Sequence, residues 1–130
     1  MQLKNIEAIT LFVEDLPAAV AFYQEAFGLP VHWADDDSTV FHLGNTVINL
    51  LKVEQAGELV TPARVGGPDA GARAQFTVHV DDADAVCAEL GRRGVALLNG
   101  PLDRPWGVRT AAFADPAGHV WEIAQPLRRD

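Results

Sequence analysis

The sequence contains one cysteine, no long apolar run and few basic residues. A single cysteine, Cys87, cannot form an intrachain disulfide, and we interpret it as a small buried residue on a helix. No stretch approaches the roughly 18–20 apolar residues that span a bilayer, so no membrane association is expected. The first residues lack a basic segment followed by a long apolar run. We therefore expect no secretory signal and a cytoplasmic location.

The shortage of basic residues gives the chain an acidic character. Ten Lys and Arg stand against 18 Asp and Glu, so the net charge is −8. Such a surface repels phosphate backbones, which makes nucleic acid an unfavourable partner, and it attracts cationic small molecules. Hydrophobic residues make up 48% of the 130 residues, which is typical of a globular chain with a core of its own. We expect a single domain over residues 1–130.

The two halves of the chain repeat one pattern. Residues 10–20 read TLFVEDLPAAV and residues 77–87 read TVHVDDADAVC, an offset of 67 residues. Each segment runs from strand-like residues through an acidic pair into a helical pattern. In the first copy Asp15 is placed to cap the helix, with Pro17 in its first turn. In the second copy the cap is Asp81 or Asp82.

Three short strand candidates follow each predicted helix. In the first half they are residues 31–34, 39–43 and 46–53; in the second they are residues 95–98, 108–114 and 119–124. We predict module one over residues 5–53, a connector over 54–73 and module two over 74–126. The fold class is α+β, with two βαβββ modules forming a cupped mixed sheet. A small molecule would be held in the concavity.

Two longer motifs carry a family resemblance that spans residues 5–126. VEDLPAAVAFYQEAFGL opens the first module, and DPAGHVWEIAQP closes the second. With this element order, the chain resembles the vicinal oxygen chelate superfamily. That superfamily includes glyoxalase I, extradiol dioxygenases, fosfomycin-resistance enzymes and bleomycin-resistance binding proteins. The resemblance implies the fold more strongly than any one activity, because the fold hosts many.

Metal enzymes of the superfamily take their ligands from the first and last strand of each half. The resemblance places Ala8, Asn49, Gln75 and Glu122 at these positions. Ala8 has no donor atom, Asn49 and Gln75 are neutral, and only Glu122 matches a charged ligand. His79 shares strand parity with Gln75, so Gln75, His79 and Glu122 form the candidate metal set. A divalent metal is therefore an alternative, and the favoured expectation is that no cofactor binds.

A second resemblance indicates binding without catalysis. The segment RPWGVR at 104–109, followed by DPAG at 115–118, looks like that of bleomycin-resistance proteins, which are homodimers that sequester an antibiotic. Indole rings stack on planar rings or cations. The candidate ligand-binding residues are Trp33, Phe41, Asn49, Trp106, Arg109 and Phe113. Trp121 should face away from the concavity and pack beneath a helix, whereas Glu122 is a candidate partner for Arg109 or for an amine of the ligand.

Two functions therefore remain open at the level of sequence. The first is a homodimeric small-molecule binding protein of the glyoxalase/bleomycin-resistance type, which sequesters a planar or cationic antibiotic or metabolite. The second is a metal-dependent lyase or dioxygenase with an unusual ligand set. The sequence favours the first, because three of the four superfamily ligand positions carry no charged or imidazole donor.

Overall fold

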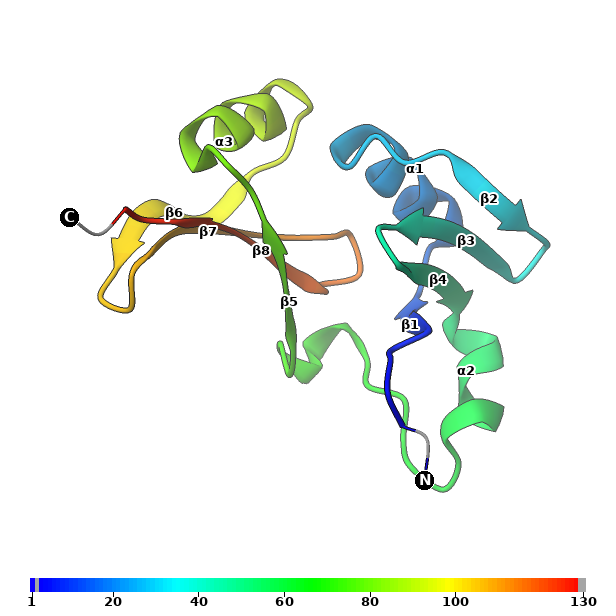
Figure 1. The fold of residues 1–130 in the computed structure, drawn as a ribbon. Helices are drawn as coiled ribbons and strands as arrows, with labels where there is room; N and C mark the ends of the chain where they lie inside the picture. The colour runs from blue at the N-terminus through cyan, green and yellow to red at the C-terminus, as the bar shows by residue number, and fades with distance from the viewer. Residues whose placement is uncertain (2, 129–130) are drawn as a thin grey trace. The chain divides into compact units, whose positions relative to one another are not determined.

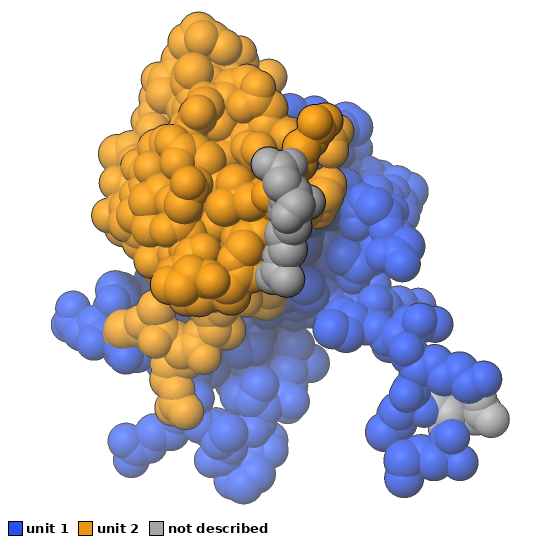
Figure 2. All heavy atoms as spheres, turned by 60° about the vertical axis from the view of Figure 1, so that its left-hand side comes forward, with its two compact units in different colours: residues 1–70 blue, residues 71–130 orange. Residues whose placement is uncertain are grey.

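A computed structural model describes residues 1 and 3–128 of the chain. The chain divides into two compact units, residues 1–70 and 71–130 (Figure 2). None of the helices in the described part of the chain is long and apolar enough to cross a membrane.

Unit 1 contains the first βαβββ module. Its elements are β1 (Ala8–Val13), α1 (Leu16–Ala26), β2 (Val31–Ala34), β3 (Ser38–Leu43), β4 (Thr46–Lys52), α2 (Val53–Val60) and the short 3₁₀ helix η1 (Pro68–Ala70). The four strands form one sheet in the order β1-β4-β3-β2 (Figure 1). β1 runs parallel to β4 and the other pairs are antiparallel, so the sheet is mixed.

Unit 2 repeats this topology. Its elements are β5 (Gln75–His79), α3 (Ala83–Arg92), β6 (Leu97–Arg104), β7 (Val108–Ala114) and β8 (Val120–Pro126). The sheet order is β5-β8-β7-β6, again with one parallel pair, β5 with β8 (Figure 1). The predicted α+β class with two βαβββ modules is confirmed.

Both predicted helix caps are present. The Asp15 carboxylate accepts a hydrogen bond of 3.0 Å from the Ala18 amide at the start of α1. Asp82, not Asp81, caps α3 by accepting a bond of 3.0 Å from the Ala85 amide. These bonds satisfy amides that the helix itself leaves unpaired and fix where each helix begins.

Each helix covers one face of its sheet. In unit 1, the Tyr23 ring of α1 lies 6.0 Å from the ring of Phe41 on β3, and both side chains are fully buried. In unit 2, Arg109 of β7 bonds to Asp84 of α3, which identifies the face of β7 that α3 covers. Trp121 lies on this α3 side, because it pairs with Phe113, which has the same parity as Arg109. The expectation that Trp121 packs beneath a helix is confirmed, and its side chain is 2% exposed.

The structure differs from the sequence prediction in two segments. The predicted connector begins with helix α2, whose Ala56 is fully buried against the rest of unit 1. Strand β6 extends to Arg104, beyond the predicted strand at residues 95–98. It continues across Gly100 because this residue lies against β7: a Cβ at Gly100 would be 2.4 Å from the Thr110 carbonyl oxygen.

Candidate functional site

The face of each sheet opposite its first helix carries the candidate site residues. We call it the far face. In unit 1 the strand register groups there Ala8, Thr10, Trp33, Val40, His42, Val47 and Asn49. In unit 2 it groups Gln75, Thr77, His79, Thr110, Ala112 and Glu122. The two units thus carry two separate sets of side chains. Their strands occupy equivalent positions in the repeat, as Thr10 and Thr77 show, which differ by the offset of 67 residues.

Asn49 on the far face of unit 1 has an unsatisfied amide oxygen. Its Nδ2 lies 3.5 Å from Thr10 Oγ1, at the outer limit of a hydrogen bond. Its Oδ1 is buried and has no hydrogen-bond partner within the described residues. A buried oxygen left in this state costs about 1–3 kcal/mol of stability. The far face of unit 1 therefore holds a polar atom whose hydrogen-bonding capacity the described residues leave unused.

Trp33 provides an exposed aromatic surface on the same face. It pairs with Val40, the residue that also opposes Asn49. Its side chain is 53% exposed at the edge strand β2. An indole so placed offers a flat apolar surface to a planar or cationic ligand.

In unit 2 the position equivalent to Asn49 is occupied by Glu122, whose carboxylate has a hydrogen-bond partner. The Thr77 hydroxyl donates a hydrogen bond of 2.9 Å to Glu122 Oε1, which orients the carboxylate on the far face. Gln75 and His79 lie on this face of β5, as their parity predicted. His79 Nε2 lies 3.2 Å from Asp81 Oδ1, and both side chains are exposed to solvent.

Arg104 is a far-face residue that sequence reasoning did not single out. Its Nε donates to Thr110 Oγ1 at 2.9 Å, and its Nη2 donates to Asn99 Oδ1 at 3.3 Å. Its guanidinium carbon lies 5.9 Å from the centre of the Trp106 ring. Trp106 is 65% exposed, but one side of its indole is thus occupied by the chain's own cation. The signal for this contact in the sequence is a basic residue, Arg104, two positions before Trp106.

Three predicted ligand residues lie on the helix-covered faces. Phe41 packs against α1 as described, and Phe113 is 2% exposed on the α3 side. Arg109 donates 2.9 Å and 3.0 Å hydrogen bonds to Asp84 and Asp103. The hydrogen bond to Asp103 and, to a smaller extent, the hydrogen bond to Asp84 raise the pKa of Arg109. These three side chains therefore lie on the faces opposite the far faces, and their role in ligand binding stays a prediction. Glu122 bonds to Thr77 instead of Arg109.

Cys87 lies on α3, as expected, and is half-buried. Burial and the nearby Asp84 raise the pKa of its thiol, against an opposing effect of Arg109. A raised thiol pKa lowers the thiolate fraction and hence the reactivity, so we assign Cys87 no chemical role.

The donor set does not fit the superfamily's divalent metal. Within either unit, no three His, Cys, Asp or Glu side chains of the described residues are grouped to hold an ion. Ala8 contributes no donor, and Asn49 contributes a neutral oxygen. Catalytic metal sites commonly use three His, carboxylate or thiolate ligands. Of the superfamily's positions, Glu122 alone meets this requirement.

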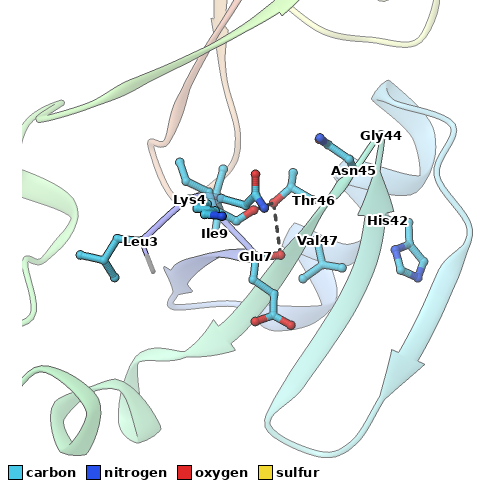
Figure 3. A pocket seen from close by; sticks show the side chains of 11 residues that line it. Leu3, Lys4, Glu7, Ile9, His42, Gly44, Asn45, Thr46 and Val47 are labelled. Carbon is cyan, nitrogen blue, oxygen red and sulfur yellow. Dashed lines mark hydrogen bonds between the residues drawn. The ribbon is translucent and has the colours of Figure 1, made fainter. Parts of the chain in front are cut away.

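An open pocket lies beside the far face of unit 1. The N-terminal segment 3–7 forms one wall, and the turn between β3 and β4 forms the other (Figure 3). The Thr46 hydroxyl joins the two walls by donating to the Glu7 carbonyl oxygen at 3.3 Å. His42 and Val47, which are partners across β3 and β4, also line the pocket.

Comparison with known proteins identifies the class of this fold. Residues 5–123 match the family model of the Glyoxalase/Bleomycin resistance protein/Dioxygenase superfamily. The chain belongs to this superfamily, as the resemblance in the sequence predicted.

Relatives and solved structures extend the comparison. The chain is 33% identical over 124 residues to the uncharacterized protein YraH of Bacillus subtilis, covering 92% of this chain and 96% of YraH. The structure resembles a glyoxalase/bleomycin resistance protein/dioxygenase from Nocardioides with a TM-score of 0.87 and 24% identity, over 100% of this chain and 88% of that one. It also resembles TnmS3, an antibiotic binding protein from Streptomyces sp. CB03234. There the TM-score is 0.72 with 29% identity, over 97% of this chain and 98% of TnmS3.

Proposed function

We propose that this protein binds a planar or cationic small molecule, such as an antibiotic or a metabolite, and sequesters it without transforming it. The observation that carries the proposal is the buried Asn49 Oδ1, which lacks a donor and lies on the same face as the exposed Trp33. A ligand with an N–H group would supply the missing hydrogen bond while its flat part stacks on the indole. The net charge of −8 attracts such a ligand when it is cationic.

The comparisons support binding as the activity. TnmS3, which is 29% identical, is described as an antibiotic binding protein. We propose that the chain forms a homodimer, because twofold-symmetric dimers are the commonest assembly of soluble oligomers. We propose a cytoplasmic location, which a chain with one cysteine and no disulfide suits. Light scattering on a size-exclusion column tests the dimer: a mass near 14.0 kDa instead of twice that value would contradict it.

Tryptophan fluorescence tests the binding. The chain has three tryptophans, of which Trp121 is buried, so bleomycin or mitomycin bound at the far face should quench Trp33 in particular. The variant Trp33→Phe should lose most of this quenching and weaken binding by roughly 0.5–2 kcal/mol. The matched variant Trp106→Phe should retain both, because Arg104 already covers one side of that ring. The absence of quenching with both drugs, or equal effects of the two variants, would contradict the proposal.

A second function is favoured by one specific observation. Glu122 retains the superfamily's charged ligand and is oriented by Thr77, although a binding protein has no need of it. The corresponding hypothesis is a metal-dependent lyase or dioxygenase that uses Gln75, His79 and Glu122. Elemental analysis of the purified protein decides the question, because substoichiometric metal and no gain of activity with Mn²⁺, Ni²⁺ or Fe²⁺ would exclude this function.

A further inference from the structure

Two histidines of unit 1 lie in contact on neighbouring strands. The rings of His32 on β2 and His42 on β3 have their centres 4.1 Å apart, with an angle of 62° between the ring planes. Both residues are exposed. Neither residue belongs to the superfamily's ligand positions at Ala8, Asn49, Gln75 and Glu122.

A β-bulge brings the two rings together. Val31 pairs with Phe41, whereas Trp33 pairs with Val40, so β2 contains one residue more than β3 over this stretch. The extra residue is His32. Bulges re-aim side chains, and this one directs His32 and Trp33 to the same side of β2, where the His32 ring meets that of His42.

We propose that His32 and His42 together bind a divalent transition-metal ion, with copper, nickel and zinc as the fitting class. Imidazole nitrogen is a preferred donor for these ions and a poor one for Mg²⁺ or Ca²⁺, which prefer oxygen. Such an ion lies about 2.0–2.1 Å from each coordinating imidazole nitrogen, so one nitrogen of each ring must turn toward the ion. The remaining coordination positions are filled by water, or by donor atoms of a molecule bound beside Trp33. Affinity follows the general order in which Cu²⁺ exceeds Ni²⁺ and Zn²⁺.

This ion is separate from the superfamily's metal. His42 pairs with Val47 on β4, and Val47 pairs with Ala8 on β1, so two strand spacings separate His42 from Ala8. With about 4.8 Å for each spacing, the two Cα atoms are roughly 10 Å apart. One ion held between His32 and His42 therefore does not occupy the position next to Ala8.

Titration calorimetry of the full-length, metal-stripped protein tests the site with CuCl₂ and ZnCl₂ as probes. The wild type should bind one ion, and His32→Gln and His42→Gln should each weaken the affinity at least about tenfold. Two variants of unit 2 serve as comparisons. The matched control is His119→Gln, which removes a histidine outside both candidate metal sets and should leave the affinity unchanged, and His79→Gln tests the alternative set on unit 2. Far-UV circular dichroism checks that each variant keeps its fold.

Electron paramagnetic resonance of the Cu²⁺-loaded wild type gives a readout that does not depend on variants. Two coordinated imidazoles should produce hyperfine splitting from two nitrogens, and either substitution should reduce it to one. The proposal is overturned if the wild type binds neither ion, if both single variants bind as tightly as the wild type, or if His79→Gln is the variant that abolishes binding. That last result would point instead to the metal set on unit 2.

Discussion

The two sheets have the same strand order, but their far faces carry different kinds of side chains. Unit 1 presents an indole, two histidines and an amide oxygen without a donor, whereas unit 2 presents a carboxylate held by Thr77 and a guanidinium held by Thr110. Thr10 opposes Asn49 in the first sheet as Thr77 opposes Glu122 in the second. The repeated backbone therefore determines on which face a side chain lies, whereas the residue type determines which hydrogen bonds it makes. In unit 1 the far face holds a buried oxygen without a hydrogen-bond partner among the described residues, whereas Glu122 and Arg104 of unit 2 bond to neighbouring threonines.

The largest effects should come from the helix-covered faces, where the two units are alike. Phe41→Ala and Phe113→Ala should each lower the free energy of unfolding by about 3–5 kcal/mol, because each removes a buried aromatic side chain. Chemical denaturation followed by circular dichroism measures this loss. The milder Phe41→Leu and Phe113→Leu should leave bleomycin binding unchanged. A loss of binding without a loss of stability would return these residues to the ligand site.

A smaller effect is expected at an edge strand of unit 2. Gly100→Ala should cost about 2–4 kcal/mol, because its φ of 87° disfavours a side chain and the new Cβ would meet the Thr110 carbonyl oxygen at 2.4 Å. Gly118→Ala is the matched control. Its φ is 94°, but nothing lies within 4 Å of the added carbon, so it should cost only about 1 kcal/mol. Equal melting temperatures of the two variants would show that β6 does not lie against β7 as described.

The contrast between Asn49 and Glu122 predicts a gain in stability when Asn49 is replaced and no gain when Glu122 is replaced. Asn49→Leu should raise the free energy of unfolding by about 1 kcal/mol, since it removes a buried oxygen that lacks a donor. The same variant should weaken binding of a ligand that donates to this oxygen. Glu122→Leu should bring no gain in stability, because its carboxylate already accepts a bond from Thr77. Urea denaturation measures both, and an equal gain in the two variants would remove the distinction between the units.

The smallest effect concerns acid stability in unit 1. Hydrogen bonds from the Asp37 and Ser38 amides lower the pKa of Asp35 below its usual 3.8. A carboxyl group with a lowered folded-state pKa contributes stability above its unfolded-state pKa, and this contribution is lost as the pH falls through the folded-state value. Between about pH 5 and pH 2.5, Asp35→Asn should therefore lose stability less steeply than the wild type. Thermal melts over this range test it, and equal slopes for the variant and the wild type would contradict it.

Much of the fold could be predicted because its signals are local. The offset repeat, the caps Asp15 and Asp82 and the alternation within strands depend only on neighbouring residues. Helix α2 was not predicted, since its first residue follows β4 directly and no side chain caps its start. A short helix of this kind depends on tertiary contacts, here the burial of Ala56, more than on its own sequence.

The candidate site was predicted less well because it depends on which face each residue occupies. The family resemblance placed Gln75 and Glu122 on one face, and the strand register groups them there. It could not show that Phe113 pairs with Trp121 and shares its buried face, because this register is set by the turn between β7 and β8. The contact between His32 and His42 arises from a bulge, which shifts the alternation by one residue and leaves no clear mark in the sequence.

The bulge in β2 also bears on how copies of this protein avoid aggregation. β2 and β6 each end their sheet, so each exposes backbone groups to which a foreign strand could add. Both strands have register shifts, and β6 contains Pro101, which has no amide hydrogen to donate. Irregular edges of this kind are poor templates for strand addition. Straightening them by mutation would thus be expected to promote fibrous or amorphous self-association, even if the folded state became no less stable.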